Sequence, residues 1–451
     1  FAPSKILAFN RNLERHHLRL TTAITSGMFL RGVPLDRIHL RPSWLYPWKK
    51  SRTRTDRVQD ACVVDGRPLD AGRRRVAVLM PYFPYPLSHG GAVRMYYLLR
   101  EAASEFDIFL FAFALKPAEA EYGPVMEFCA KAVVMPAPYY REPRWSTLDP
   151  PEVAEYRSAA MEGLIERIRR EYGIRVLQVE YTQMATYGGD ILVEHDITSD
   201  LYRQVYEREP TIGARWNWYR WQRFERRAVR QFARVVAMSE KDAQWVARPE
   251  AARVIENGVD LDRFQPQPER DGRQLLFIGS FNHFPNIEAF RFFREQIWPL
   301  LPPEVTLTVV AGRDHAAYWR AFTGDASLPE DERIDVHDFV RDVKPMYAGA
   351  NLVIVPTTVS AGTNLKVLEA MAMERAVVST SCGCAGLGLE HGKSVWVADD
   401  AAGFAAGVIR LLGEAGERRR LAVAARAICE RQFGWKDLGA KQRALFREVC
   451  D

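Results

Sequence analysis

The chain has 451 residues, of which 47% are hydrophobic and 26% are charged. These fractions are ordinary for a globular protein, so they exclude a mostly disordered chain, and the length predicts two or three domains. No apolar run is long enough to span a bilayer, and six scattered cysteines without metal-finger spacing favour a reducing compartment. Because the chain starts with Phe1 rather than Met, we expect a segment to be missing upstream.

The net charge of +5 is unevenly distributed along the chain. Residues 1–75 carry +10 and the remainder carries −5. Nucleic-acid-binding proteins usually concentrate positive charge on the folded domain, so this distribution argues against a nucleic-acid partner. We interpret the basic leader as a solvated, partly helical extension, and contact with an anionic membrane or an acidic partner is the alternative.

After Arg75, short runs rich in Val, Ile and Phe alternate with helical stretches. Most runs are continuously apolar, which is typical of strands buried on both faces in parallel sheets. About thirteen strands are too many for one ordinary sheet, so the pattern predicts an α/β protein with two doubly wound domains. The first predicted series is 76–80, 106–114, 132–135, 176–180, 191–194 and 235–238, and the second is 254–255, 275–279, 306–311, 334–337, 352–355, 376–379 and 395–397.

The boundary between the two domains is predicted near Arg248-Pro249, after a long helical segment at 214–234. The turn signal Asn257-Gly258 follows early in the second domain. The predicted divisions are a basic extension at 1–74, an N-terminal domain at 75–248, a C-terminal domain at 249–430, and a C-terminal helix at 431–451 packing back toward the N-terminal domain.

The segment from Pro356 to Ala372 carries the strongest chemical signal. A buried strand ends there, a loop of small residues follows, and a helix is predicted to start near Asn364. A helix N-terminus favours anions, and a glycine such as Gly362 lets a phosphate approach the backbone. Lys366 adds a positive charge, and Glu369 on the same helix side offers a carboxylate to a pair of ribose hydroxyls. The alternative interpretation is a capped helix with a surface Lys–Glu pair.

Three further segments follow predicted strands. Gly90-Gly91 comes after the first strand and would let the backbone approach a ligand, although a plain strand–helix turn explains it equally well. The stretch from Gly279 to Asn286 repeats the order of strand, glycine turn and helix start. His195 ends another strand and could donate a hydrogen bond to a substrate, with a histidine that fixes a loop as the alternative.

Together these residues resemble the glycosyltransferases of family 4, which have the GT-B architecture of two facing Rossmann-like domains. The resemblance covers most of the chain from Arg75 onwards and rests on the order and spacing of several motifs. They are Gly90-Gly91, His195-Asp196, Ser239-Glu240, Asn257-Gly258-Val259-Asp260, Gly279-Ser280 and Gly362-Thr363-x-x-Lys366-x-x-Glu369-Ala370.

The resemblance implies retaining transfer of a sugar from a nucleotide-sugar donor held mainly by the C-terminal domain, with the acceptor in the cleft against the N-terminal domain. It implies that Glu369 holds the ribose, the loop at 362–364 with Lys366 holds the diphosphate, and His195 reaches the transferred sugar. Catalysis would come from positioning and from stabilising the charge of the leaving diphosphate. The candidate catalytic residues are His195, Asp196 and Lys366, and the candidate donor-binding residues are Gly90, Gly91, Gly279, Ser280, Asn282, His283, Gly362, Thr363, Asn364 and Glu369.

Two departures from the family pattern stand out. Position 361 is Ala, so the first glutamate of the family's usual pair is absent. The Arg and Lys that commonly follow the glycine near position 279 are also absent, which leaves diphosphate neutralisation to Lys366 with help from His283 or Arg313. No metal or other cofactor is expected.

Residues 215–234 interleave aromatic residues with arginines. An amphipathic helix of this composition can lie on a membrane surface, which would suit a lipid-linked acceptor. The simpler interpretation is a domain helix that packs its aromatic residues inward, and base stacking is a third alternative that the acidic body disfavours.

The leading hypothesis is therefore a cytoplasmic glycosyltransferase of polysaccharide biosynthesis. One option is that the protein associates peripherally with the inner face of the membrane. Its acceptor would be a glycan, a lipid-linked molecule or a small molecule. A sugar-nucleotide epimerase of the same fold and a non-catalytic GT-B scaffold that docks a membrane or partner are the alternatives.

Overall fold

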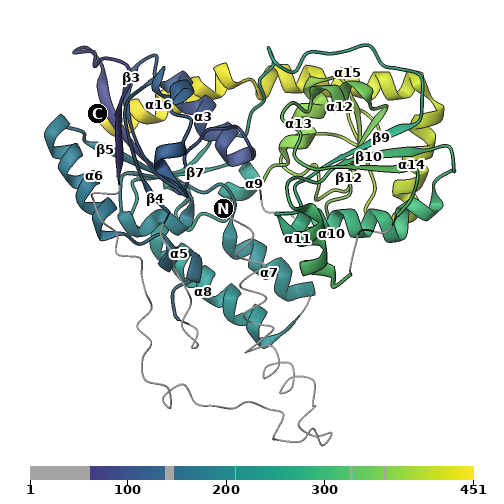
Figure 1. Cartoon of the computed structure of the whole chain (residues 1–451), viewed down its shortest axis with the longest axis horizontal. Coiled ribbons are helices and arrows are strands. Elements are labelled where there is room, and N and C mark those ends of the chain that lie inside the picture. Colours follow the sequence, from purple (N-terminus) through teal and green to yellow (C-terminus); the bar gives the residue numbers. More distant parts are fainter. Residues whose placement is uncertain (1–60, 138–146, 209, 326–327, 329, 360–361) are drawn as a thin grey trace, which may run out of the picture. The chain divides into compact units, whose positions relative to one another are not determined.

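The computed structural model describes residues 61–451 except 138–146, 209, 326–327, 329 and 360–361. The chain divides into two compact units, and each consists of a β-sheet covered by helices on both faces (Figure 1). The prediction of an α/β fold with two doubly wound sheets is confirmed. Unit 1 comprises the described residues up to Glu256 together with Leu438–Asp451, and unit 2 comprises Asn257–Asp437.

The sheet of unit 1 has eight strands in the order β1-β4-β3-β2-β5-β6-β7-β8. All neighbouring strands are parallel except β1, which runs antiparallel to β4. The central strands are almost continuously buried because helices cover both of their faces. The strands are β1 (Cys62–Asp65), β2 (Arg74–Met80), β3 (Phe106–Ala114), β4 (Cys129–Pro136), β5 (Val176–Glu180), β6 (Ile191–Val193), β7 (Arg234–Ala237) and β8 (Ala252–Val254).

The helices of unit 1 lie on both sides of this sheet, with α3 and α16 on one side and α6 and α8 on the other (Figure 1). Successive strand residues point to opposite faces, so Ala77 and Leu79 belong to the core under α6 and α8. On the other face, the ring of Phe106 packs 5.3 Å from that of Phe446 in α16. The helices are α3 (Gly90–Ala102), α4 (Gly123–Met126), α5 (Pro151–Glu155), α6 (Ala159–Tyr172), α7 (Thr198–Arg208), α8 (Ile212–Val229), α9 (Glu240–Ala243) and α16 (Trp435–Cys450), with 3-10 turns at Pro117–Glu119, Thr182–Tyr187 and Pro249–Ala251.

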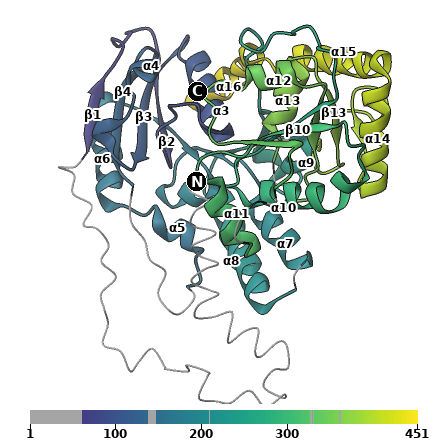
Figure 2. The ribbon, with the colours of Figure 1, turned by 45° about the vertical axis from the view of Figure 1, so that its right-hand side comes forward.

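The sheet of unit 2 has six parallel strands in the order β11-β10-β9-β12-β13-β14. Figure 2 shows α12 and α13 on one side of it and α10 and α11 on the other. The strands are β9 (Gln274–Ile278), β10 (Thr306–Val310), β11 (Ile334–His337), β12 (Leu352–Val355), β13 (Ala376–Ser379) and β14 (Trp396–Val397). The helices are α10 (Phe284–Phe292), a π-helix at Phe293–Ile297, a 3-10 turn at Trp298–Leu300, α11 (His315–Thr323), α12 (Lys344–Gly349), α13 (Leu365–Ala372), α14 (Ala401–Gly413) and α15 (Ala415–Gln432).

All thirteen predicted strands are present. The structure differs from the predicted elements at three places. The strand β1 was not predicted, because its short sequence Cys-Val-Val-Asp is only half-buried at the sheet edge. The strand β8 was placed in the second domain, yet it pairs with β7, so unit 1 extends to Glu256 rather than ending at 248. The helix predicted at 214–234 ends at Val229, and Arg234 begins β7.

The strand order reverses between β2 and β5 in unit 1 and between β9 and β12 in unit 2. At such a switch point the two connecting segments leave toward opposite faces of the sheet, which opens space outside the carboxyl ends of the two strands. Ligands of open α/β sheets bind there. The segments that follow β9 and β12 are those that hold the predicted donor-binding residues of unit 2.

Candidate functional site

A hydrogen bond links the two sides of the switch point in unit 2. The Nζ atom of Lys366, in the first turn of α13, donates to Oδ1 of Asn286 in α10 at 2.8 Å. The amide nitrogen of Asn286 in turn donates to the backbone oxygen of Ser280, just after β9, at 2.9 Å. Lys366 also lies over the ring of Phe277, 5.5 Å from its centroid. The lysine is thus held at the carboxyl edge of β9 and β12.

Glu369 is held separately from Lys366. Its Oε2 atom accepts a hydrogen bond from the hydroxyl of Tyr347 at 2.7 Å, and Tyr347 in α12 is completely buried. In the described part of the chain no ion pair joins Lys366 to Glu369, so the alternative of a surface Lys–Glu pair is not observed. The second carboxylate oxygen has no hydrogen bond to a described residue.

Several buried polar atoms along this edge have no hydrogen-bond partner among the described residues. They lie directly after β9 and β12, where a bound ligand would reach them. A buried polar group without a partner costs about 1–3 kcal/mol, so these four atoms make this edge a candidate ligand site. The atoms are Oδ1 of Asn282 and Oγ1 of Thr357, Thr358 and Thr363.

Glycines at this edge allow other groups to approach the backbone closely. Gly362, three residues before the start of α13 at Leu365, has a φ angle of 96°, which favours glycine. Asn364 is the N-cap residue, but its side chain donates to the backbone oxygen of Gly383 at 2.9 Å and does not cap the helix. At Gly279, an added Cβ would lie 2.7 Å from the amide of Asn286, so this glycine permits the link to Lys366.

Partial burial shifts the pKa values of the titratable residues of the site. Burial lowers the pKa of Lys366 to about 8, against the opposing effect of Glu369. Burial likewise raises the pKa of Glu369, and the hydrogen bond from Tyr347 partly offsets the shift. Desolvation and then the charge of Lys366 lower the pKa of His283, and because this residue is exposed, solvent screens part of the effect. A neutral His283 contributes little to neutralising a diphosphate, and Arg313 lies over the ring of Phe339 at 4.8 Å.

In unit 1, His195 is held by a buried carboxylate that the sequence analysis did not select. Its Nε2 atom lies 2.7 Å from Oε2 of Glu180 at the end of β5, and the two side chains are 8% and 5% exposed. Oε1 of Glu180 accepts from Gln178 at 2.6 Å, and Gln178 accepts from Gln442 of α16 at 2.9 Å. Burial lowers the pKa of His195, with Glu180 opposing the shift.

This arrangement decides which hydrogen bond His195 can offer. A carboxylate only accepts hydrogen bonds, so the proton of the neutral ring resides on Nε2. The Nδ1 atom then carries a lone pair and accepts a hydrogen bond, whereas the sequence analysis expected His195 to donate one. The ring stacks on Tyr181 with centroids 3.8 Å apart and planes 2° apart, which fixes its orientation.

Gly91 lies against two tyrosine hydroxyls of the same unit. An added Cβ would be 1.9 Å from the hydroxyl of Tyr181 and 2.2 Å from that of Tyr82, and these two hydroxyls share a hydrogen bond. His89 is the N-cap of α3, and Gly90 is its first residue. The absence of a side chain at Gly91 therefore permits the close packing of the two tyrosines.

Asp196 lies beside other carboxyl groups. Its Oδ1 atom accepts a hydrogen bond from Thr198 at 2.8 Å, and burial raises its pKa to about 6. The neighbouring Glu194 and Glu225 also have raised pKa values, mainly because they are buried. Among the residues that the structure describes, no hydrogen bond joins Asp196 to His195, and no group of three or more His, Cys, Asp or Glu has the arrangement of a metal site.

The structure thus divides the predicted site residues between the two units, and it adds several that the sequence analysis missed. Ala361, which replaces the family's first glutamate, lies outside the described residues. Glu180 could have been suspected because it is an acid that ends an apolar strand, while Tyr347 gave no sequence signal. In the described part of the chain, no helix combines the length and hydropathy needed to cross a bilayer.

Two family models match successive parts of the chain. The model described as Glycosyltransferase Family 4 matches residues 88–263, and that described as Glycosyl transferases group 1 matches residues 272–414. Both models describe glycosyltransferases and together they match most of the chain, so the protein is a glycosyltransferase. Among curated proteins, an uncharacterized 44.6 kDa protein in the cps region of Klebsiella pneumoniae is 28% identical over 140 residues, a match that spans 36% of that relative.

Solved structures with the GT-B fold are similar to this glycosyltransferase over most of its length. Sucrose-phosphate synthase from Thermosynechococcus elongatus has a TM-score of 0.66 at 18% identity, covering 84% of this chain and 99% of that one. HepE from Anabaena, in complex with UDP-glucose, has a TM-score of 0.59 at 15% identity and coverages of 83% and 99%. WaaG, involved in lipopolysaccharide biosynthesis, has a TM-score of 0.57 at 16% identity and coverages of 82% and 99%. At these identities the likeness establishes the fold.

Proposed function

We propose that this glycosyltransferase moves a sugar from a nucleoside-diphosphate sugar to an acceptor hydroxyl, with retention of the anomeric configuration. The observation that carries the proposal is the hydrogen bond between Lys366 and Asn286 across the switch point of unit 2, with unpartnered polar atoms beside it. The similar HepE is described in complex with UDP and with UDP-glucose, which supports a donor of this class.

The donor-binding roles follow from charge and position. Lys366 pairs with the diphosphate, and Gly362 lets a phosphate approach the amides at the start of α13. Glu369, oriented by Tyr347, accepts hydrogen bonds from the ribose hydroxyls. The hydroxyl of Thr363 and the amide oxygen of Asn282 bind polar groups of the same ligand.

In the reaction, the bond between the anomeric carbon and the β-phosphate oxygen breaks, and a bond to the acceptor oxygen forms. The acceptor proton passes to the departing diphosphate. Lys366 and the helix amides stabilise the charge of that leaving group, and positioning supplies much of the remaining rate enhancement. We propose that no resident metal takes part, so a chelator is expected to leave the activity unchanged.

On the acceptor side, the Nδ1 atom of His195 is suited to accept a hydrogen bond from a sugar hydroxyl. We propose a polysaccharide precursor or another glycan as the acceptor, with a lipid-linked or small-molecule acceptor as the alternative, and a cytoplasmic location. The likeness to WaaG and the position of the curated relative in a cps region support the polysaccharide class.

The test is a melting experiment with a panel of nucleotide sugars, followed by hydrolysis assays without acceptor. One donor is expected to raise the melting temperature of the wild type, and Lys366→Met and Glu369→Ala are expected to abolish that shift. Lys393→Met, which changes an exposed lysine paired with Glu390, is the matched control and should retain it. A shift that survives in both site variants contradicts the binding assignment.

The stereochemistry of the product separates the remaining possibilities. Proton NMR of the glycoside should show the anomeric configuration of the donor, and an inverted product contradicts the proposed mechanism. Isomerisation of the donor without acceptor would instead identify an epimerase. Absence of turnover with every donor, despite binding, would favour a non-catalytic scaffold.

A further inference from the structure

The solvent-facing side of α8 has a polarised composition. One face of the helix carries residues that recur at helical spacing, namely Ile212, Tyr219, Arg223, Arg226 and Arg230. The opposite face of α8 is buried in the core of unit 1 and includes Trp221, Phe224, Ala228 and Val229. The outer face is therefore left to solvent. We refer to the outer residues, from Ile212 to Arg230, as the α8 face.

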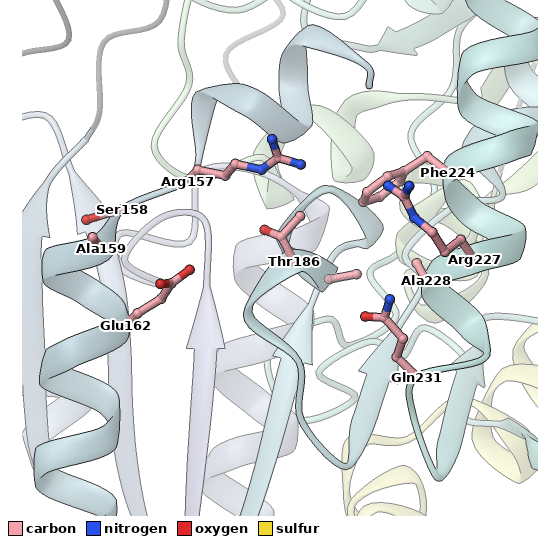
Figure 3. Close-up of a pocket in the computed structure, with 10 residues that line it drawn as sticks. Arg157, Ser158, Ala159, Glu162, Thr186, Phe224, Arg227, Ala228 and Gln231 are labelled. Atoms are coloured by element: carbon pink, nitrogen blue, oxygen red, sulfur yellow. The ribbon is translucent and has the colours of Figure 1, made fainter. Parts of the chain in front are cut away.

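The arginine end of the α8 face borders two adjoining hollows. One has a volume of about 500 Å³ and is enclosed by α6, α8 and the turn after β5 (Figure 3). The other has a volume of about 530 Å³ and shares Arg227 and Gln231 with the first. Together they are lined by the arginines Arg157, Arg223, Arg226, Arg227 and Arg230 and by the single acid Glu162.

These arginines carry more positive charge than their surroundings neutralise. Asp149 binds Arg157 at 2.7 Å and Arg227 at 3.1 Å, and Arg223 lies 3.7 Å from it. Arg226 and Arg230 are exposed and have no ion pair with a described residue. Including Asp149, five arginines face two acids here, although residues 76–451 as a whole are acidic. The surface is therefore suited to an anionic partner with several phosphate or carboxylate groups.

Toward its start, the α8 face exposes apolar side chains beside the exposed Arg215. Ile212 is 52% exposed and Tyr219 is 50% exposed, and the ring of Tyr219 stacks on Trp216 with centroids 5.6 Å apart. Leu148 is 55% exposed and adjoins the arginines, because its neighbour Asp149 pairs with Arg227. A soluble glycan or nucleic acid would not bury an exposed isoleucine and leucine. A lipid bilayer would, while its headgroup phosphates meet the arginines.

We propose that the α8 face docks the protein on an anionic phospholipid bilayer. Ile212 and Tyr219 enter the headgroup region, and Arg223, Arg226 and Arg230 contact lipid phosphates. The proposal concerns a surface separate from the donor-binding residues of unit 2 and does not depend on the sugar transfer proposed above.

The experiment measures sedimentation of the full chain with vesicles rich in phosphatidylglycerol and with vesicles of phosphatidylcholine alone. Reversing the charge at Arg226→Glu together with Arg230→Glu is expected to lower the partition coefficient for the anionic vesicles by about tenfold or more. The matched control reverses Arg167→Glu and Arg170→Glu on the exposed side of α6, and it should leave the partition coefficient unchanged. Equal binding by the α8 variant and the wild type overturns the proposal.

A second variant separates a bilayer from a soluble polyanion. Ile212→Ser with Tyr219→Ser retains every arginine and is expected to weaken vesicle binding while leaving retention on a heparin column unchanged. If this variant binds anionic vesicles as the wild type does, the bilayer proposal is overturned in favour of a soluble polyanion. Both variants change exposed side chains, and circular dichroism verifies that they fold.

Discussion

The Nε2 atom of His195 lies 2.7 Å from Oε2 of Glu180. Through Gln178, the same carboxylate is linked to Gln442 in the last helix, which is far away in the sequence. These hydrogen bonds run along one face of β5, a central strand of the first sheet, and end at an imidazole whose other nitrogen keeps its lone pair. The last helix of the chain thereby contributes to the orientation of a candidate catalytic histidine.

Replacing Glu180 by Gln is expected to lower the pKa of His195 further. The carboxylate stabilises the protonated ring and opposes the effect of burial, so removing its charge favours the neutral ring. Nitrogen-15 NMR of the histidine side chains measures this change, and in the wild type it should show the proton of the neutral ring on Nε2. Glu166→Gln, an exposed change on α6, is the control. An unchanged titration in Glu180→Gln would show that the contact does not control the ring.

Lys366→Met is expected to stabilise the protein at pH 7 while abolishing donor binding. The pKa of Lys366 is about 8 in the folded protein, below its value of about 10.4 in an unfolded chain. The unfolded chain therefore binds more protons between these values, and stability is lost as the pH falls through this window. Methionine removes that loss, which raises the free energy of unfolding by about 1–2 kcal/mol after allowance for solvent screening.

Urea unfolding at two pH values tests this expectation. The advantage of Lys366→Met should be present at pH 7 and should shrink above about pH 10, where the lysine is neutral in both states. The exposed Lys393→Met should show no comparable pH dependence. A variant that is less stable than the wild type by the same amount at both pH values would contradict the assigned cost of burying this charge.

Tyr347→Phe is expected to weaken donor binding with a smaller effect on kcat. The tyrosine hydroxyl donates to Glu369 at 2.7 Å and lowers the pKa of that carboxyl, so its loss raises the pKa and frees the side chain to rotate. A hydrogen bond to a charged group contributes about 1.5–3 kcal/mol, so KM for the nucleotide sugar should rise about tenfold or more. Tyr318→Phe on α11 is the matched control. A change in kcat alone would contradict a positioning role for Tyr347.

Gly91→Ala and Gly163→Ala should change stability in opposite directions. At Gly91 the added methyl group would lie 1.9 Å from the hydroxyl of Tyr181, so the tyrosines must move at a cost of about 1–3 kcal/mol. At Gly163, within α6, the methyl group has nothing within 4 Å and should stabilise the helix by about 0.5–1 kcal/mol. Thermal unfolding measures both changes. Equal stability of Gly91→Ala and the wild type would show that the tyrosines relax freely.

Local sequence was sufficient to predict the elements of the fold. Thirteen runs rich in apolar residues indicated thirteen strands because burial on both sides leaves few positions for polar residues. The strand at Cys62–Asp65 escaped notice because it pairs at a half-buried edge. The strand at Ala252–Val254 was assigned to the wrong sheet because its pairing with β7 depends on which strand edge is open, and local sequence does not encode that.

The sequence by itself determined the two doubly wound sheets, the glycines after their strands, and the presence of Lys366 and Glu369 in the first turns of one helix. Only the tertiary structure decided what those charges contact: Asn286 for the lysine, Tyr347 for the glutamate and Glu180 for His195. The physical reason is that backbone pattern follows from residues adjacent in the chain, whereas a side chain's protonation and hydrogen bonds depend on atoms that folding brings from distant segments.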